Sequence, residues 1–274
     1  MLPVAGGECF CVWRAPESTA QRGAVLHLPA FGDEMNKSRA MTASASRRFA
    51  MQGFGVLTLD LLGTGDSTGD FGDGSIGRWT DDIGCALDWL DTRTEGPVWL
   101  WCLRFGALLA SPVLNRTHAK ASLLLWQPVL AGAQYLTHLL RMKIAGAAPG
   151  DRQGLAPLRQ RIRDGHSIEI GGYGISSRLA CELEKAGLDV AREDVGRIRW
   201  LEVSASAAPT LSPAARARIA EFDAAGIDVT GSVLQGPGFW QSAEIESCPG
   251  LIDASVTALT SESILGIPRD SAVL

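Results

Sequence analysis

Short apolar runs recur along the chain, and each is followed by a turn or by a segment with helical spacing. Buried parallel strands read as continuous apolar runs, because neither face of such a strand meets water. The alternation of these runs with helical segments predicts a mostly parallel sheet with helices on both faces. The predicted core strands are 24–28, 55–59, 98–102, 122–126 and 200–203.

The segments around these strands carry recognisable signals of their own. Residues 8–15 alternate between apolar and polar positions and predict an antiparallel edge strand. Ser75 is placed to cap a helix over 76–92, where Ile76, Trp79 and Ile83 begin a core-facing stripe. Further elements are predicted as helices at 35–52, 105–114, 213–225 and 251–260 and a strand at 228–234.

Between residues 142 and 193 the hydrophobic pattern weakens into a glycine-containing, arginine-rich stretch. We interpret this segment as a lid inserted into an α/β domain. The predicted organisation is a core formed by residues 1–141 and 194–274, with the lid at 142–193.

Composition narrows the class of protein. With 274 residues, 46% of them hydrophobic and 20% charged, the chain is long enough for one large α/β domain. A net charge of −5 without a basic block argues against nucleic acid as a partner. No apolar stretch reaches the roughly 20 residues needed to span a bilayer, and the N-terminus lacks a secretory signal, so we expect a cytoplasmic protein.

The six cysteines show no zinc-binding spacing, and we expect buried, reduced thiols. The sequence implies no metal and no cofactor.

A glycine-rich turn follows the second core strand. Asp60-Leu61-Leu62-Gly63-Thr64-Gly65-Asp66-Ser67-Thr68-Gly69 resembles the DxxGxGxSxG turn of α/β-hydrolases. Its glycines permit positive φ and a close crossing of the chain. We expect Asp66 and Ser67 to shape this turn, and we retain Asp66 as a candidate catalytic carboxylate.

The turn after the third core strand is where an α/β-hydrolase carries its nucleophilic serine on a strand-to-helix elbow. Here the chain reads Trp101-Cys102-Leu103-Arg104-Phe105-Gly106, so Arg104 stands at the apex. A guanidinium has five donors and no lone pair, and it cannot attack a carbonyl. The acid position, at 204–208, has no carboxylate, and Phe239 stands where the catalytic base is expected. His27 falls in a buried strand, and His118, His138 and His166 are predicted in remote loops or the lid.

Several segments together resemble the bacterial exosortase A system-associated hydrolases of type 2. The resemblance lies in Phe31 to Met41 with its Glu34-Met35-Asn36-Lys37 core, in 60–72, in Leu103-Arg104, and in Gly236-Pro237-Gly238-Phe239-Trp240. It implies an α/β-hydrolase fold, an esterase- or thioesterase-like activity, and a place in a system of exopolysaccharide or envelope assembly. A protein of that system is therefore an expected partner.

The residues at the elbow allow two interpretations. Arg104 should project from the start of a helix, where backbone amides and the helix dipole favour anions, so that it forms an anion site. Alternatively, Arg104 is paired internally with Glu34 or Asp66 and ties loops together. We expect the surrounding pocket to be lined by Phe31, Asn36, Phe105, Phe239, Trp240 and Glu244.

Two functional hypotheses follow. The first is an atypical hydrolase of a small ester or thioester, in which Arg104 polarises the substrate and Glu34 or Asp66 directs water. It requires a carboxylate that lies within about 3 to 4 Å of Arg104 and also faces an open pocket. The second is a catalytically degenerate relative that binds an anionic small molecule or a partner protein through the former active site.

Overall fold

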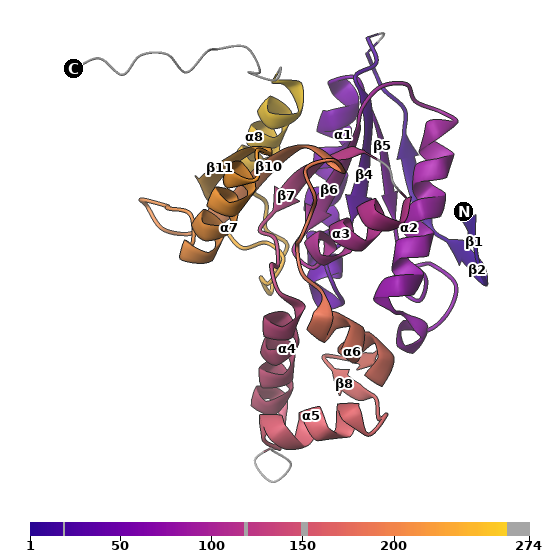
Figure 1. Ribbon diagram of the computed structural model, residues 1–274, viewed down its shortest axis with the longest axis vertical. Helices are drawn as coiled ribbons and strands as arrows, with labels where there is room; N and C mark the ends of the chain where they lie inside the picture. Colours follow the sequence, from indigo (N-terminus) through magenta and orange to yellow (C-terminus); the bar gives the residue numbers. More distant parts are fainter. Residues whose placement is uncertain (19, 118–119, 149–152, 262–274) are drawn as a thin grey trace.

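The computed structural model describes residues 1–18, 20–117, 120–148 and 153–261. A seven-stranded sheet in the order β11-β10-β7-β6-β4-β5-β3 forms its centre (Figure 1). All pairs are parallel except β3 with β5. The strands are β3 (Cys11–Arg14), β4 (Gly23–Leu28), β5 (Phe54–Leu59), β6 (Val98–Leu103), β7 (Ala121–Trp126), β10 (Val195–Ser204) and β11 (Asp228–Gln235).

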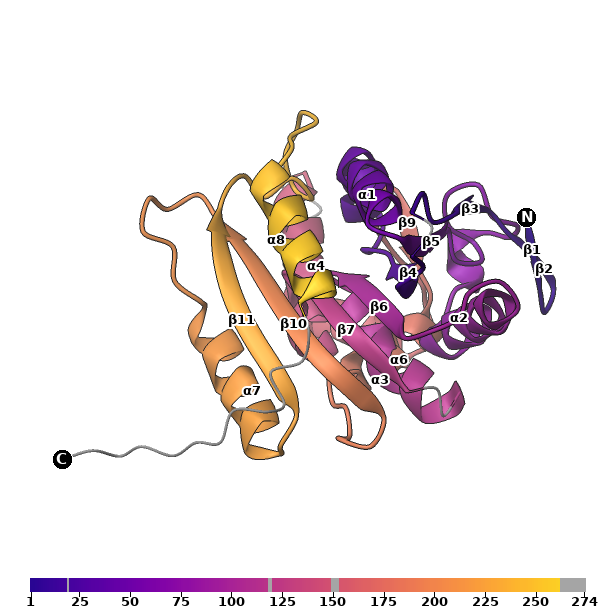
Figure 2. The same ribbon diagram turned by 90° about the horizontal axis from the view of Figure 1, so that it is seen from above.

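Helices cover both faces of the sheet (Figure 2). One face packs against α1 (Asp33–Met51) and α8 (Pro249–Thr260), and the other against α2 (Ile76–Asp91), α3 (Gly106–Thr117) and α7 (Pro213–Ala224). The predicted α/β class with a mostly parallel sheet is therefore confirmed. The central strands β4, β6 and β7 are almost completely buried, as their continuous apolar runs predict.

Residues at the ends of these helices and strands help to determine where the elements begin and end. The Ser75 side chain accepts a hydrogen bond from the Arg78 amide and caps α2, as predicted. Gly53 follows α1 with φ of 91°, the left-handed conformation that ends many helices. Strand β10 begins earlier than predicted, because the two arginines that interrupt its apolar run are satisfied within the fold. Arg197 donates to the Ser261 carbonyl and Arg199 pairs with Asp228.

Hydrogen bonds connect the N-terminal strands to the glycine-rich turn at 60–69. Hairpin strands β1 (Leu2–Val4) and β2 (Gly7–Cys9) lead into β3, and a short 3₁₀ helix, η1 (Phe71–Asp73), follows the turn. The Ser67 hydroxyl donates to the Asp60 carbonyl and accepts from the Phe10 amide. Gly63, with φ of 76°, lets the turn approach residue 70 closely. The turn is thus structural, as expected of Ser67.

The chain between β7 and β10 forms a separate lobe beyond the carboxyl ends of the strands (Figure 1). Its elements are α4 (Gly132–Gly146), α5 (Leu155–Arg163), the hairpin β8 (Ile168–Ile170) and β9 (Tyr173–Ile175), and α6 (Ser177–Lys185). Helix α4 continues through residues 141 and 142, so no structural break marks the predicted lid boundary. The function of this lobe as a lid stays a prediction.

No helix within the described residues combines the length and the apolar character needed to cross a membrane.

Candidate functional site

Arg104 occupies a strained elbow between β6 and α3. Its φ is 52°, and among the described residues only Gln127 shares a positive φ without being glycine. The Arg104 amide donates to the Trp126 carbonyl, and its own carbonyl accepts from the amides of Ala107 and Val129. Arg104 therefore lies on a sharp reversal of the chain between β6 and α3.

Gly106 allows the helix after the elbow to lie against the neighbouring strand. A Cβ atom at this position would lie 2.2 Å from the Leu28 carbonyl oxygen. The glycine is thus required by packing at the point where α3 begins.

The Arg104 side chain is held from several directions. Its Nε and Nη2 donate to Oε1 of Glu34 at 3.2 and 3.0 Å, and Nη1 contacts the Gln127 carbonyl at 3.4 Å. The guanidinium carbon also lies 5.4 Å from the centroid of the Trp240 ring, within range of a cation–π contact. Glu34, and not Asp66, is therefore the internal partner of Arg104.

Glu34 lies in the first turn of α1, where the helix dipole stabilises a negative charge. Its second oxygen, Oε2, accepts a hydrogen bond of 3.1 Å from the Tyr135 hydroxyl on α4. Burial raises the pKa of Tyr135 well above its ordinary value, and the adjacent Glu34 carboxylate raises it further. Tyr135 consequently remains a neutral hydrogen-bond donor.

The carboxylate partner changes the electrostatics expected of the elbow. The Arg104 and Glu34 side chains are each only 18% exposed, and their opposite charges compensate one another. The predicted anion site is therefore already occupied by a carboxylate of the protein itself. An external anion at Arg104 would have to compete with Glu34.

A cavity of about 330 Å³ opens beside this pair. Its wall is mostly apolar and aromatic, with polar groups near Glu34. The lining residues are Phe31, Gly32, Asp33, Glu34, Lys37, Tyr135, His138, Leu139, Met142, Ile170, Gly171, Tyr173, Ile175, Trp240 and Gln241. Arg104 is not among them, so Glu34 is the member of the ion pair that lines the cavity.

The predicted ligand-binding residues separate into two groups. Phe31 and Trp240 line the cavity. Phe105 and Phe239 are buried in the packing beneath it: Phe105 contacts Phe31, and Phe239 contacts Trp240. These two residues shape the wall indirectly.

The polar candidates also differ in position. Asn36 is exposed and donates a 2.8 Å hydrogen bond to the hydroxyl of Tyr173, which lines the cavity. Asp66 is exposed, and its backbone amide bonds to the Asp60 carboxylate in the glycine-rich turn. Glu244 is exposed and does not line the cavity. Catalytic and binding roles for these residues stay predictions.

One of the histidines lies elsewhere than the sequence predicts. His27 is buried and its Nδ1 bonds to the Trp101 carbonyl, and burial lowers the pKa of His27 to about 4. His138, which was expected to be remote, lies on α4 and lines the cavity. His166 is exposed after α5, and His118 lies outside the described residues.

Tyr135, His138 and Tyr173 were not recognised from the sequence. On α4, Tyr135, His138, Leu139 and Met142 recur at spacings that place them on one face of a helix, and all four line the cavity. That spacing was the available sequence signal, but a helix packed in an ordinary hydrophobic core shows the same spacing. Tyr173 lies in a short hairpin with no distinctive pattern.

Metal binding finds no support in the arrangement. Within the described parts of the chain, no cluster of three or more His, Cys, Asp or Glu side chains is placed to hold an ion. All six cysteines are free, and buried Cys102 has its pKa raised by desolvation.

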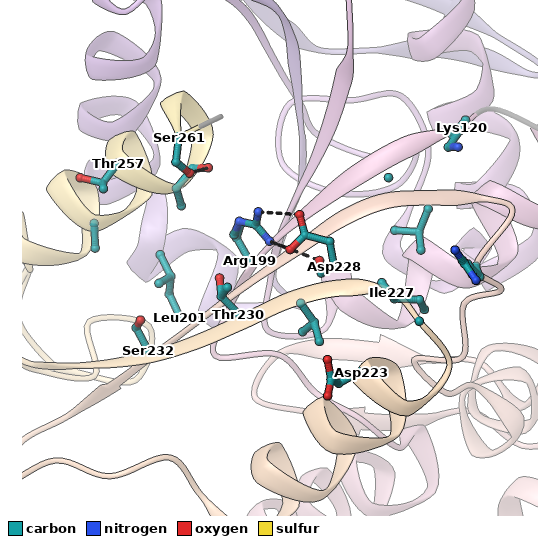
Figure 3. Close-up of a pocket in the computed structure, with 17 residues that line it drawn as sticks. Lys120, Arg199, Leu201, Asp223, Ile227, Asp228, Thr230, Ser232, Thr257 and Ser261 are labelled. Atoms are coloured by element: carbon teal, nitrogen blue, oxygen red, sulfur yellow. Dashed lines mark hydrogen bonds and ion pairs between the residues drawn. The ribbon is translucent and has the colours of Figure 1, made fainter. Parts of the chain in front are cut away.

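A larger hollow of about 1000 Å³ lies away from the elbow, between the sheet edge and α8 (Figure 3). The Arg199–Asp228 ion pair lies at its centre, where two hydrogen bonds of 3.0 Å join β10 to β11. The two charges therefore compensate one another, and the pair holds neighbouring strands of the sheet together.

Comparison with known proteins shows similarity in structure but not in sequence. The chain matches no protein-family model and no curated protein. The ferulic acid complex of Est1E from Butyrivibrio proteoclasticus has a TM-score of 0.60 and 12% identity, over 94% of this chain and 95% of that one. Mouse α/β hydrolase domain-containing protein 10 has a TM-score of 0.55 and 15% identity, over 92% of each chain. The monoacylglycerol lipase of Paleococcus ferrophilus has a TM-score of 0.56 and 16% identity, over 92% of this chain and 98% of that one.

Proposed function

We propose that this chain, which has the α/β-hydrolase fold, binds an amphipathic small molecule in the former active-site cavity without serine-hydrolase chemistry. The observation that carries the proposal is the neutralised elbow, where Arg104 is paired with Glu34 at 3.0 Å. The acyl-enzyme route needs a nucleophile and a base, and in our interpretation of the sequence Arg104 and Phe239 stand at those two positions. Binding requires neither.

The cavity favours a particular kind of ligand. Its volume of about 330 Å³ falls at the lower end of small-molecule sites, which span roughly 300 to 1,000 Å³. Leu139, Ile170 and Ile175 offer an apolar wall for an alkyl or aryl group. Glu34 keeps unused acceptor capacity, because each carboxylate oxygen has two lone-pair directions. We therefore expect a neutral ligand that donates a hydrogen bond from a hydroxyl or amide.

Ligand-induced stabilisation tests this proposal. We would measure the unfolding temperature and the heat of binding with medium-chain alcohols, monoacylglycerols and N-acyl amides, each compared with its carboxylic acid counterpart. The expected result is stabilisation by the neutral donors and weaker stabilisation by the acids, since an acid must compete with Glu34 or approach its charge.

Two variants test whether the ligand binds in this cavity. Leu139→Trp fills the cavity and should abolish binding, whereas Ser232→Trp in the separate hollow of Figure 3 should leave it unchanged. A stronger response to the acids, lost in Arg104→Ala, would replace this ligand class with the anionic one. No response to any probe would count against binding in this cavity.

A second candidate is an atypical esterase- or thioesterase-like hydrolase. The observation in its favour is that Glu34 meets both requirements of that hypothesis, lying 3.0 Å from Arg104 and lining the cavity. In this route water attacks the carbonyl carbon, Glu34 accepts the water proton, and the alcohol or thiol leaves after protonation. Taking that proton would weaken the three hydrogen bonds that hold Glu34, and this cost makes the binding function the better supported one.

Turnover of a panel of esters and thioesters separates the two candidates. Hydrolysis by the wild type that Glu34→Gln and Arg104→Ala both lose would establish the hydrolase. The resemblance to the exosortase-associated hydrolases extends either proposal to a cytoplasmic role in exopolysaccharide or envelope assembly with a protein partner of that system. Co-purification of such a partner with the wild type tests this extension.

A further inference from the structure

The lobe that carries the cavity wall has an unusual charge. Residues 141–163 hold six Lys or Arg and one Asp, although the whole chain has a net charge of −5. In the structure residues 141–146 form the end of α4 and residues 155–163 form α5, at the end of the lobe away from the sheet (Figure 1). We call this surface the basic end and define it by Arg141, Lys143, Arg159, Arg161 and Arg163.

Internal pairing accounts for only part of this charge. Arg159 pairs with Glu184, and Lys143 donates to the Glu169 carbonyl, which leaves its ammonium charge uncompensated. Arg141 and Arg161 have no ion pair among the described residues. The basic end thus presents net positive charge to its surroundings.

Apolar groups lie among these cations. Met142, between Arg141 and Lys143, is 51% exposed, one of few large apolar side chains with such exposure. Next to it, a shallow hollow of about 420 Å³ is lined by Arg141, Ile144, Ala145 and Leu155. A purely electrostatic polymer-binding surface would gain nothing from these apolar groups. A lipid surface offers partners for both kinds, since it combines charged headgroups with an apolar interior.

We propose that the basic end docks on the surface of an anionic bilayer, with cations on the headgroups and Met142 inserted at their base. The basic end adjoins the cavity, because Met142 also lines the cavity beside Glu34. If the proposed ligand-binding function holds, docking brings the apolar end of the cavity to the bilayer, from which an amphipathic ligand can enter.

Vesicle co-sedimentation with the full chain tests the docking. We expect binding to vesicles of phosphatidylglycerol and phosphatidylcholine, weakening with added salt, and none to pure phosphatidylcholine. Each basic residue near an anionic surface contributes about a fivefold gain in affinity, so Arg141→Glu/Arg161→Glu should lose at least about 25-fold. Arg47→Glu/Arg216→Glu, a matched reversal elsewhere on the exposed surface, should lose far less.

A matched pair of variants tests the contribution of the apolar Met142 side chain to vesicle binding. Met142 and Met51 are equally exposed at 51%, so Met142→Ser should weaken vesicle binding and Met51→Ser should not. Unchanged unfolding temperatures would exclude misfolding as the cause. Equal binding by both charge-reversal variants, or binding to heparin without binding to anionic vesicles, would overturn the proposal. Leu139→Trp should keep vesicle binding even where it abolishes ligand binding, so the two proposals fail separately.

Discussion

A single oxygen of Glu34 accepts hydrogen bonds from both Nε and Nη2 of Arg104. The two residues are 70 positions apart, on the first turn of α1 and on the elbow after β6. Their pairing places an ion pair without net charge at the turn between β6 and α3. The other Glu34 oxygen joins this pair to α4 through Tyr135, so three elements meet at one carboxylate.

Removal of both partners should cost less than the sum of the two single removals. Arg104→Met or Glu34→Leu alone leaves a partly buried charge without its partner, and we expect each to lower the free energy of unfolding by about 1 to 3 kcal/mol. The double variant should lose less than the sum, with a coupling energy of about 1 kcal/mol or more. Urea unfolding of the four proteins measures this coupling. Strict additivity would show that the pair contributes nothing as a pair.

A serine at position 104 should not make this protein a serine hydrolase. Arg104→Ser places a hydroxyl at the elbow, but Phe239 carries no titratable group and the loop at 204–208 has no carboxylate. We expect no burst of product with p-nitrophenyl acetate and no labelling by a fluorophosphonate. Covalent labelling at residue 104 would show that another group activates the hydroxyl, with His138 on the cavity wall as the first residue to substitute.

The elbow should not tolerate a methyl group at Gly106. Gly106→Ala would place a Cβ 2.2 Å from the Leu28 carbonyl oxygen, in backbone that has little room to move. We expect a loss of about 3 kcal/mol in the free energy of unfolding. Gly146→Ala at the end of α4 is the control, because a Cβ there has no atom within 4 Å and alanine favours the helix. Similar unfolding midpoints for the two variants would contradict the close approach.

Acid should destabilise the protein in part through His27. Burial lowers the pKa of His27 to about 4 in the folded chain, against an ordinary value of 6.5 in the unfolded one. The unfolded chain therefore takes up the proton first as the pH falls. Stability from the neutral imidazole is complete above pH 6.5 and declines toward pH 4, by about 3 kcal/mol in total. Urea midpoints of the wild type and His27→Gln between pH 7 and 4 should converge as the pH falls; parallel curves would assign the acid sensitivity to other groups.

The sheet could be predicted because its strands are short apolar runs bounded by turns, and burial on both faces leaves such a run few alternatives. Strand β6 was predicted within one residue of its observed end. Helix α4 was not assigned, and α5 and the β8–β9 hairpin were hidden in a stretch whose polar and basic residues dilute the hydrophobic period. Their packing against one another, rather than local propensity, fixes these elements.

The pairing of Arg104 could be predicted from the sequence, whereas the roles of the candidate site residues stay predictions. Arg104 and Glu34 lie in segments with a recognisable motif, and they proved to be partners. Tyr135 contacts Glu34 across 101 residues, a distance that no local pattern encodes. Glu244 was expected beside Trp240, but the chain turns after residue 240 and leaves that carboxylate exposed.

The backbone conformation of Arg104 carries an energetic cost of its own. A glycine adopts a positive φ without steric cost, whereas a residue with a side chain is disfavoured there by about 1 kcal/mol or more. Gln127, the other such residue among those described, accepts a contact from Arg104 at the end of the adjacent strand. Two side chains thus persist in backbone positions where glycine would be easier to accommodate. Substitution of either residue by glycine would therefore relieve a local backbone cost while removing the contacts that its side chain makes.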